Sequence, residues 1–209
     1  MFQILYFFKR YFTNYFISGV LRKGKGTHLS CCIGRHISKN SGNSIVIGDN
    51  SSLADCRFLM KGKNNRITIG SNCALKGVSF WMSGDNNEIH IGDYTTVGHN
   101  TEFATLESTC ISVGEDCMFS HNIQVRTSDS HSILDQEGNR TNPAKDIHIG
   151  NHVWIGLEVL LLKGSEINDN SVVAARSMVT KPFINEGCLI GGAPAKEIKS
   201  EINWSRDRK

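Results

Sequence analysis

Proline is scarce in this sequence, which has only 3 prolines beside 20 glycines in its 209 residues. Many turns with few prolines favour a repeated β architecture. The chain also lacks a strong excess of one charge, because its formal net charge is +3. That balance excludes the strongly basic class of nucleic-acid-binding domains. The length is enough for one domain with a sizeable core.

No Cys-x-x-Cys pair is present, although the sequence contains 7 cysteines. An odd number of cysteines without metal-ligand spacing argues against a disulfide framework and against a zinc site built from cysteines. The N-terminus also lacks the features of a secretory signal peptide. These absences predict a cytoplasmic protein whose reduced thiols serve as small core residues.

An aromatic segment opens the chain, but it lacks the run of about 20 apolar residues that a membrane span needs. Lys9 and Arg10 interrupt it. Residues 1–27 are therefore predicted to form a separate aromatic and basic segment, most of it helical. Three interpretations remain open for this segment. It packs on the main body or on another subunit, it is disordered, or residues 1–25 make peripheral contact with the inner face of a membrane.

An internal repeat of 22 residues is marked by Ile-Gly or Val-Gly at positions 47, 69, 91 and 113. Large apolar residues recur at intervals of six through and beyond these units. The series is Ile47, Leu53, Leu59, Ile69, Leu75, Trp81, Ile91, Val97, Phe103, Val113, Phe119, Val125, Ile149, Ile155, Leu161, Ile167, Val173 and Val179. Neither a helix nor a simple strand has this period. A coil with three short flat faces does, which predicts an all-β parallel β-helix over residues 28–182 with a C-terminal extension at 183–209.

The residues beyond three hexapeptides all fall between the third face of one coil and the first face of the next. The largest insertion is a loop at about residues 129–146. Long loops in compact repeats are usually functional or disordered, and a rigid scaffold commonly positions the functional ones. Because this loop contains His131, the sequence points to it as the place of the chemistry.

Three segments carry a resemblance to a known family: Thr127-Ser-Asp-Ser-His131, Asp146-Ile-His-Ile-Gly-Asn-His-Val-Trp-Ile-Gly156 and Gly191-Gly-Ala-Pro-Ala-Lys196. With the hexapeptide pattern, they resemble the left-handed β-helix acetyltransferases, which include galactoside and maltose acetyltransferases. The resemblance extends furthest to the capsular polysialic acid O-acetyltransferases, which share the ending Asn203-Trp204. It implies a left-handed coil, acetyl-coenzyme A as co-substrate with no metal requirement, and a homotrimer with active sites between subunits.

The resemblance implies roles for the matched residues. His131 would be the general base that takes the proton of a sugar hydroxyl, and histidine titrates in a suitable range for this step. Trp154 would line the site beside the acetyl group and the acceptor. A backbone N–H at Gly156 or Leu157 would bind the oxyanion. The other implied coenzyme A contacts are Ala175, Thr180, Lys181, Lys196 and Lys199.

The predicted function is direct O-acetylation of a sugar hydroxyl on a bacterial surface polysaccharide, a capsule or an O-antigen. N-acetylation of an amino sugar or nucleotide sugar is the nearer alternative, and a non-catalytic scaffold is another. A β-helix carbonic anhydrase is a further alternative, with His148, His152 and His121 as zinc ligands. Neither the sugar, nor the hydroxyl, nor the group that orients His131 is identified; Asp129, Asp135 or a backbone carbonyl is a candidate for that group.

Overall fold

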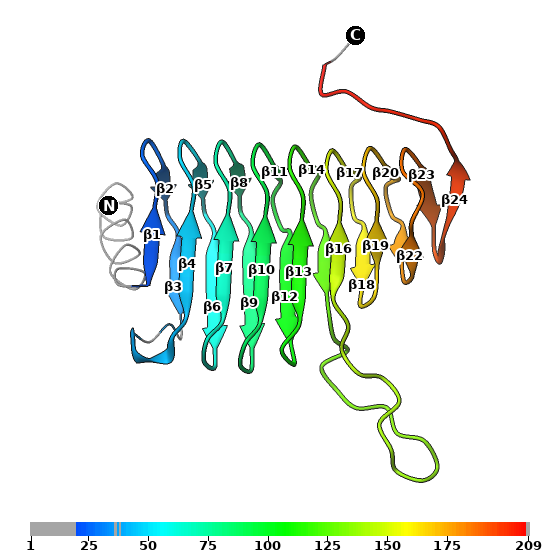
Figure 1. Cartoon of the computed structure of the whole chain (residues 1–209), viewed down its shortest axis with the longest axis horizontal. Helices are drawn as coiled ribbons and strands as arrows, with labels where there is room; N and C mark the ends of the chain where they lie inside the picture. The colour runs from blue at the N-terminus through cyan, green and yellow to red at the C-terminus, as the bar shows by residue number, and fades with distance from the viewer. Residues whose placement is uncertain (1–19, 36, 38, 208–209) are drawn as a thin grey trace, which may run out of the picture.

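The computed structural model describes residues 20–207 apart from 36 and 38, and within them the chain forms a three-sided parallel β-helix (Figure 1). The first sheet contains β1 (Leu21–Lys23), β4 (Ser44–Ile47), β7 (Arg66–Ile69), β10 (Glu88–Ile91), β13 (Cys110–Val113), β16 (Ile147–Ile149), β19 (Glu166–Ile167) and β22 (Pro182–Phe183). The second sheet contains β2 (His28–Ser30), β5 (Ser52–Ala54), β8 (Ala74–Lys76), β11 (Thr96–Val97), β14 (Met118–Phe119), β17 (Trp154–Ile155), β20 (Val172–Val173), β23 (Leu189–Gly192) and β24 (Ala195–Lys199). The third sheet contains β3 (Ile33–Arg35), β6 (Arg57–Lys61), β9 (Ser79–Ser83), β12 (Glu102–Leu106), β15 (Gln124–Arg126), β18 (Leu160–Leu162) and β21 (Met178–Val179), and one short 3-10 helix, η1 (Lys39–Ser41), precedes β4.

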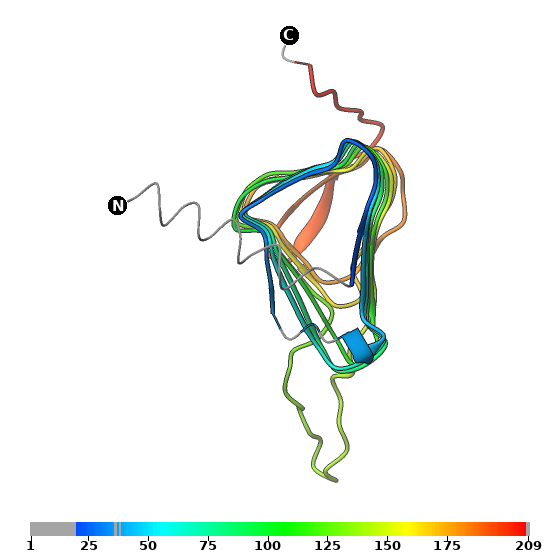
Figure 2. The ribbon, with the colours of Figure 1, turned by 90° about the vertical axis from the view of Figure 1, so that its left-hand side faces the viewer.

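The coil is left-handed, as the resemblance implied. Each turn visits the first, second and third sheets in order, and each strand pairs with strands one turn away, as β7 does with β4 and β10. Seen from the end nearest β1, the chain runs counter-clockwise through the first, second and third sheets as it recedes from the viewer, which is the sense of a left-handed coil (Figures 1 and 2). This hand is the exception among parallel crossovers.

Stacked inward side chains fill the prism, but the register of the third sheet differs from the prediction. Phe80 is fully buried and stacks between Phe58 and Phe103, with ring centroids 5.0 and 5.6 Å apart. Trp81 and Leu59, which were predicted to be core residues, point outward. The prediction was wrong at these two positions because the inward residues of the second and third sheets are five apart in these coils, as in Leu75 and Phe80, and not six apart as in Val97 and Phe103.

The Ile-Gly and Val-Gly pairs mark the corner between the first and second sheets. A Cβ on Gly92 would lie 2.6 Å from the carbonyl carbon of Gly114 in the next coil, so only glycine permits this approach. Two residues further on, the turn needs a left-handed backbone, and φ is 59° at Tyr94, 52° at Asp116 and 51° at His152. These three side chains consequently lie along one edge, one in each coil.

Buried amides stack at the corner between the third and first sheets. The N–H of Asn65 donates to Oδ1 of Asn43 at 2.9 Å, and the N–H of Asn87 donates to Oδ1 of Asn65 at 2.9 Å. The N–H of Thr109 donates to Oδ1 of Asn87 at 3.3 Å, and the hydroxyls of Thr109 and Thr127 are 2.6 Å apart. The long loop leaves the prism directly after this ladder and projects from the same edge (Figure 1).

At the N-terminal end, β1 pairs with β4 and is the first strand of the first sheet. The predicted helix of the aromatic segment lies outside the described residues. Within the part of the chain that the structure describes, no helix has the length and hydropathy to cross a bilayer. The cysteines are all unpaired, and the buried ones are Cys32, Cys56, Cys73, Cys117 and Cys188.

Candidate active site

An ion pair ties the long loop to the preceding coil. Arg140 in the loop donates two hydrogen bonds to the carboxylate of Glu107, at 2.6 and 2.9 Å. The hydroxyl of Ser128 donates to the same carboxylate at 2.7 Å. These bonds, that of Arg140 above all, lower the pKa of Glu107 to about 2. The loop is therefore fastened at its base over the whole neutral pH range.

Asn142 and Lys163 hold the backbone around His131. The side-chain amide of Asn142 donates to the His131 carbonyl at 2.9 Å and to Asp129 at 2.7 Å, and its oxygen accepts from the N–H of Ile133 at 2.7 Å. Lys163 lies 2.5 Å from the same carboxylate of Asp129 and lowers its pKa. The main chain at His131 is thus fixed, while its imidazole is exposed.

The imidazole of His131 has no hydrogen-bond partner among the described residues. The two carboxylates considered from the sequence are engaged elsewhere. Asp129 pairs with Lys163, and Asp135 accepts from the N–H of Asn139 at 2.7 Å. The chain's own loop carboxylates therefore do not set the tautomer of His131.

Trp154 lies on the opposite side of the prism from His131. It begins β17 in the second sheet, and its side chain is 38% exposed. The loop that carries His131 leaves the corner between the third and first sheets, which faces away from the second sheet (Figures 1 and 2). One chain does not bring these two residues together, so a site that uses both takes them from different copies.

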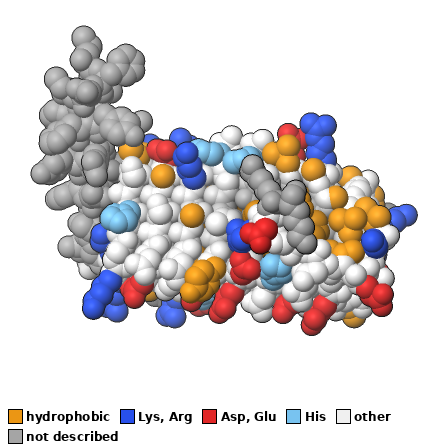
Figure 3. Space-filling view, turned by 90° about the horizontal axis from the view of Figure 1, so that it is seen from above, with side chains coloured by type: hydrophobic (Ala, Val, Ile, Leu, Met, Phe, Trp, Pro, Cys, Tyr) orange, Lys and Arg blue, Asp and Glu red, His pale blue; other side chains and the backbone are white. Residues whose placement is uncertain are grey.

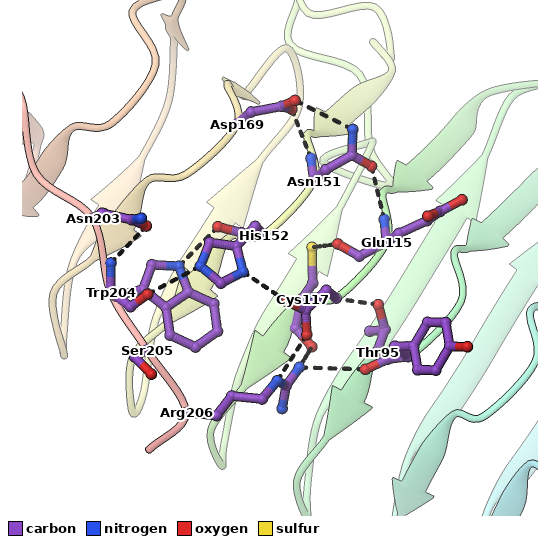
Figure 4. A network of polar contacts seen from close by, with 12 residues as sticks. Thr95, Glu115, Cys117, Asn151, His152, Asp169, Asn203, Trp204, Ser205 and Arg206 are labelled. Atoms are coloured by element: carbon purple, nitrogen blue, oxygen red, sulfur yellow. Dashed lines mark hydrogen bonds and ion pairs between the residues drawn. The ribbon is translucent and has the colours of Figure 1, made fainter. Parts of the chain in front are cut away.

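The C-terminal strap, residues 203–206, lies beside His152 and Cys117 at the corner between the first and second sheets (Figure 4). The Trp204 ring stacks on the imidazole of His152, with centroids 4.3 Å apart and planes at 9°. The indole N–H of Trp204 donates to the His152 carbonyl at 2.8 Å. The Trp204 ring is also 6.0 Å from the Trp154 ring, at an angle of 46°. The three rings form one aromatic group on the edge of the second sheet.

Asp116 joins the strap to the preceding coil. Its carboxylate accepts from Nδ1 of His152 at 2.7 Å and from Nε of Arg206 at 2.8 Å. Burial alone would raise the pKa of Asp116, but the bonds from His152 and Arg206 outweigh burial and lower it. Nε2 of His152 also lies 3.1 Å from the Trp204 carbonyl. Because both ring nitrogens face acceptors, only the protonated imidazole donates both bonds.

Three of the predicted coenzyme A residues lie at the corner between the second and third sheets. Gly156 and Leu157 follow β17, and Ala175 follows β20 in the next coil. A Cβ on Gly156 would lie 2.7 Å from the backbone nitrogen of Ala175, which explains the glycine. The N–H of Gly156 already donates to the Val173 carbonyl at 2.8 Å, whereas the N–H of Leu157 has no acceptor among the described residues. Leu157 therefore offers the free donor at this corner.

The remaining predicted contacts are exposed and lie apart from that corner. Thr180 and Lys181 follow β21 at the corner between the third and first sheets, whereas Lys196 and Lys199 lie on β24, which pairs antiparallel with β23. Apolar side chains gather at this end of the prism (Figure 3). The exposed large ones are Trp154, Leu157, Ile184 and Ile198. The C-terminal coils thus combine basic and apolar surface.

The histidines of the carbonic anhydrase alternative, His148, His152 and His121, form no metal-ligand group within the described ranges. A different group there has the spacing for a cation: Glu88, His90 and Cys110. Burial, with help from nearby carboxylates, raises the pKa of Cys110 to about 11, which disfavours the thiolate that a metal requires. Neither group favours metal chemistry.

Comparisons with known proteins identify the family, although no family model matches the chain. The solved structure of the polysialic acid O-acetyltransferase OatWY is 34% identical, has a TM-score of 0.79, and is matched over 92% of this chain and 87% of that chain. A polysialic acid O-acetyltransferase of Escherichia coli O1:K1 / APEC is 39% identical over 85 residues, 40% of this chain and 27% of the relative. A chloramphenicol acetyltransferase of Morganella morganii is 45% identical over 60 residues, 29% of this chain and 28% of the relative.

The chain thus spans less than a third of the length of these two curated relatives. The match to OatWY nevertheless extends over nearly the whole chain, and the protein therefore belongs to the hexapeptide-repeat acetyltransferase family that includes the polysialic acid O-acetyltransferases.

Proposed function

We propose that this protein transfers the acetyl group of acetyl-coenzyme A to a hydroxyl group of a bacterial surface polysaccharide. The observation that carries the proposal is the similarity to OatWY over 92% of this chain at 34% identity. Because that relative is named for polysialic acid, a polymer of sialic acid is the first acceptor to test. The reaction would take place in the cytoplasm, on polymer at the inner face of the membrane.

His131 is the general base of the proposed reaction. Its exposed imidazole takes the proton of the sugar hydroxyl while the oxygen attacks the thioester carbonyl, and it then returns that proton to the leaving thiolate. The carbon–oxygen bond forms and the carbon–sulfur bond breaks, so no acyl-enzyme is needed. The free N–H of Leu157 donates to the oxyanion between these steps.

The proposed site takes its parts from two copies in a homotrimer. His131 comes from the loop of one copy, and Trp154 lines the acetyl site on the second sheet of the next. Coenzyme A lies along the coils of that second copy. The residues proposed to hold it are Gly156, Leu157, Ala175, Thr180, Lys181, Lys196 and Lys199.

A transfer assay with matched variants tests the proposal. Purified protein is incubated with acetyl-coenzyme A and polysialic acid, and the products are analysed by mass spectrometry before and after mild alkali, which removes O-acetyl esters. We expect an alkali-labile acetyl group and a loss of roughly 100-fold or more in His131→Ala. His148→Ala, which removes an exposed histidine on β16, is the control.

Two results would contradict this function. Undiminished transfer by His131→Ala would refute the proposed role of His131 as the general base. An alkali-stable product formed only on an amino sugar would instead support the alternative, N-acetylation.

A further inference from the structure

We propose that Trp204 is a positioning residue for Trp154, so that the C-terminal strap completes the acetyl-transfer site. The inference relies on the function proposed above for the role of Trp154. Its geometric basis is independent of that function: the indole ring of Trp204 is held by contacts with His152 (Figure 4), and it lies 6.0 Å from the partly exposed ring of Trp154.

Trp204 is itself held firmly. Its ring stacks on His152 at 4.3 Å, its indole N–H donates to the His152 carbonyl at 2.8 Å, and the guanidinium of Arg206 lies 5.7 Å from its ring centroid. A stacking partner, a directional hydrogen bond and a nearby cation together leave this ring one orientation. A fixed ring can impose its geometry on a neighbour.

Trp154 depends on this neighbour for its own orientation. Its in-register partners on adjacent strands are the flexible Met118 and the short Val172, neither of which restrains an indole ring strongly. Trp204 is its aromatic contact within the described residues, at 6.0 Å and 46°. This tilted contact occupies one side of Trp154, and the side chain remains 38% exposed for a substrate.

Arg206 anchors the strap to coils distant from Trp154 in sequence. Its guanidinium donates to Asp116 at 2.8 Å, to the hydroxyl of Thr96 at 3.0 Å, and to the carbonyls of Cys117 and Tyr94 at 2.8 and 3.3 Å. All four partners lie in the two coils that precede Trp154. The strap is thus seated on the prism by its own polar contacts.

The strap adds little to the fold itself. The parallel pairing of β14 with β17 and of β17 with β20 is complete without it, and the buried core contains no residue of the strap. Losing the Trp204 ring should therefore disturb the orientation of Trp154 and leave the coils in place. This distinguishes a positioning role from a merely structural one.

The test compares Trp204→Ala with Trp204→Phe in the full-length protein. Near-ultraviolet circular dichroism reports the coupled rings of Trp154 and Trp204, and steady-state kinetics separate kcat from KM for acetyl-coenzyme A. We expect Trp204→Ala to lose the coupled signal and at least about 10-fold in kcat, since a small misplacement of a reacting group costs up to about 100-fold. Trp204→Phe, which keeps a stacking ring, should retain kcat within about 3-fold, the range of context-dependent packing effects.

Two controls accompany these variants. Trp81→Phe replaces an outward tryptophan on β9 and should change neither kcat nor the coupled circular dichroism signal of Trp154 and Trp204. Arg206→Ala keeps both rings but removes the anchor, and should shift kcat in the same direction as Trp204→Ala. The melting temperatures show whether each variant is folded.

The outcomes separate the two proposals. A wild-type protein without acetyl transfer would refute the proposed function, and the positioning role with it. An active wild type whose folded Trp204→Ala variant has the same kcat would refute the positioning role alone. Equal losses in Trp204→Ala and Trp204→Phe would also refute it, because a stacking ring should rescue.

Discussion

Co-expression of His131→Ala and Trp154→Ala chains should restore acetyl transfer that neither variant has alone. The reason is that the loop with His131 projects from the edge of the prism that faces away from the second sheet, whereas Trp154 lies on β17 of that sheet (Figures 1 and 2). In the proposed homotrimer, each site therefore takes its histidine from one copy and its tryptophan from the next. A mixed trimer contains a junction at which both native residues meet.

The size of the recovery follows from the ring geometry. In a closed ring of three copies, one junction joins a native His131 to a native Trp154 whether the mixture is two-to-one or one-to-two. Every mixed trimer should thus have about one third of the wild-type activity. The acetyl-transfer activity of each variant alone should be roughly 100-fold below that of the wild type, because one lacks the general base and the other lacks the tryptophan that lines the acetyl site.

The assay uses chains with two different affinity tags and sequential purification on both, which selects mixed assemblies. Light scattering gives their mass, and transfer to polysialic acid gives their activity. His131→Ala chains carrying both tags are the control and should stay inactive. Mixed trimers as inactive as either variant would show that the site lies within one chain, and a monomeric mass would remove the trimer itself.

Three further predictions concern the fold and the loop. Phe80→Ala should lower the free energy of unfolding by about 3–5 kcal/mol and Trp81→Ala by at most about 1 kcal/mol, measured by chemical denaturation; the reverse order would contradict the register described above. The pKa of Glu107 is lowered from 4.5 to about 2, so its bonds stabilise the loop fully above pH 4.5, and this stabilisation is lost as the pH falls toward 2. Amide hydrogen exchange of residues 128–142 should therefore rise on acidification, and Glu107→Gln should raise it at neutral pH; exchange independent of both would contradict the brace with Arg140. Gly156→Ala would place a Cβ 2.7 Å from backbone of the next coil, so both the melting temperature and transfer should fall; an unchanged melting temperature would show that the coils separate freely there.

The six-residue period was enough to predict the coil, because one inward side chain per face must recur whatever the corners do. It was not enough to place Trp81 and Leu59. A corner shortened by one residue moves the following strand by one position, and an apolar residue stands on both sides of the shift. The sequence does not show which of two adjacent apolar residues points inward, because that depends on the backbone conformation of the preceding corner.

The candidate site was predictable where it is local and hidden where it joins distant residues. His131 could be located by its loop, and Leu157 by the family motif. The brace of Glu107 with Arg140 joins two surface charges that look solvated in the sequence. The ending Asn203-Trp204 resembles that of the family, but the contact of Trp204 with His152 depends on where the chain crosses the prism. Periodicity carries no information about either pairing.

The ladder of Asn43, Asn65 and Asn87 means that the length of the prism can change only by whole coils. Successive coils in this half share their length and their amide positions, so residues 66–87 form an interchangeable module. Deleting that module would rejoin two equivalent corners and bring β1 closer to the loop by one strand spacing, about 4.8 Å. The number of modules therefore sets the distance between β1 and the loop in discrete steps, without altering the loop or the strap.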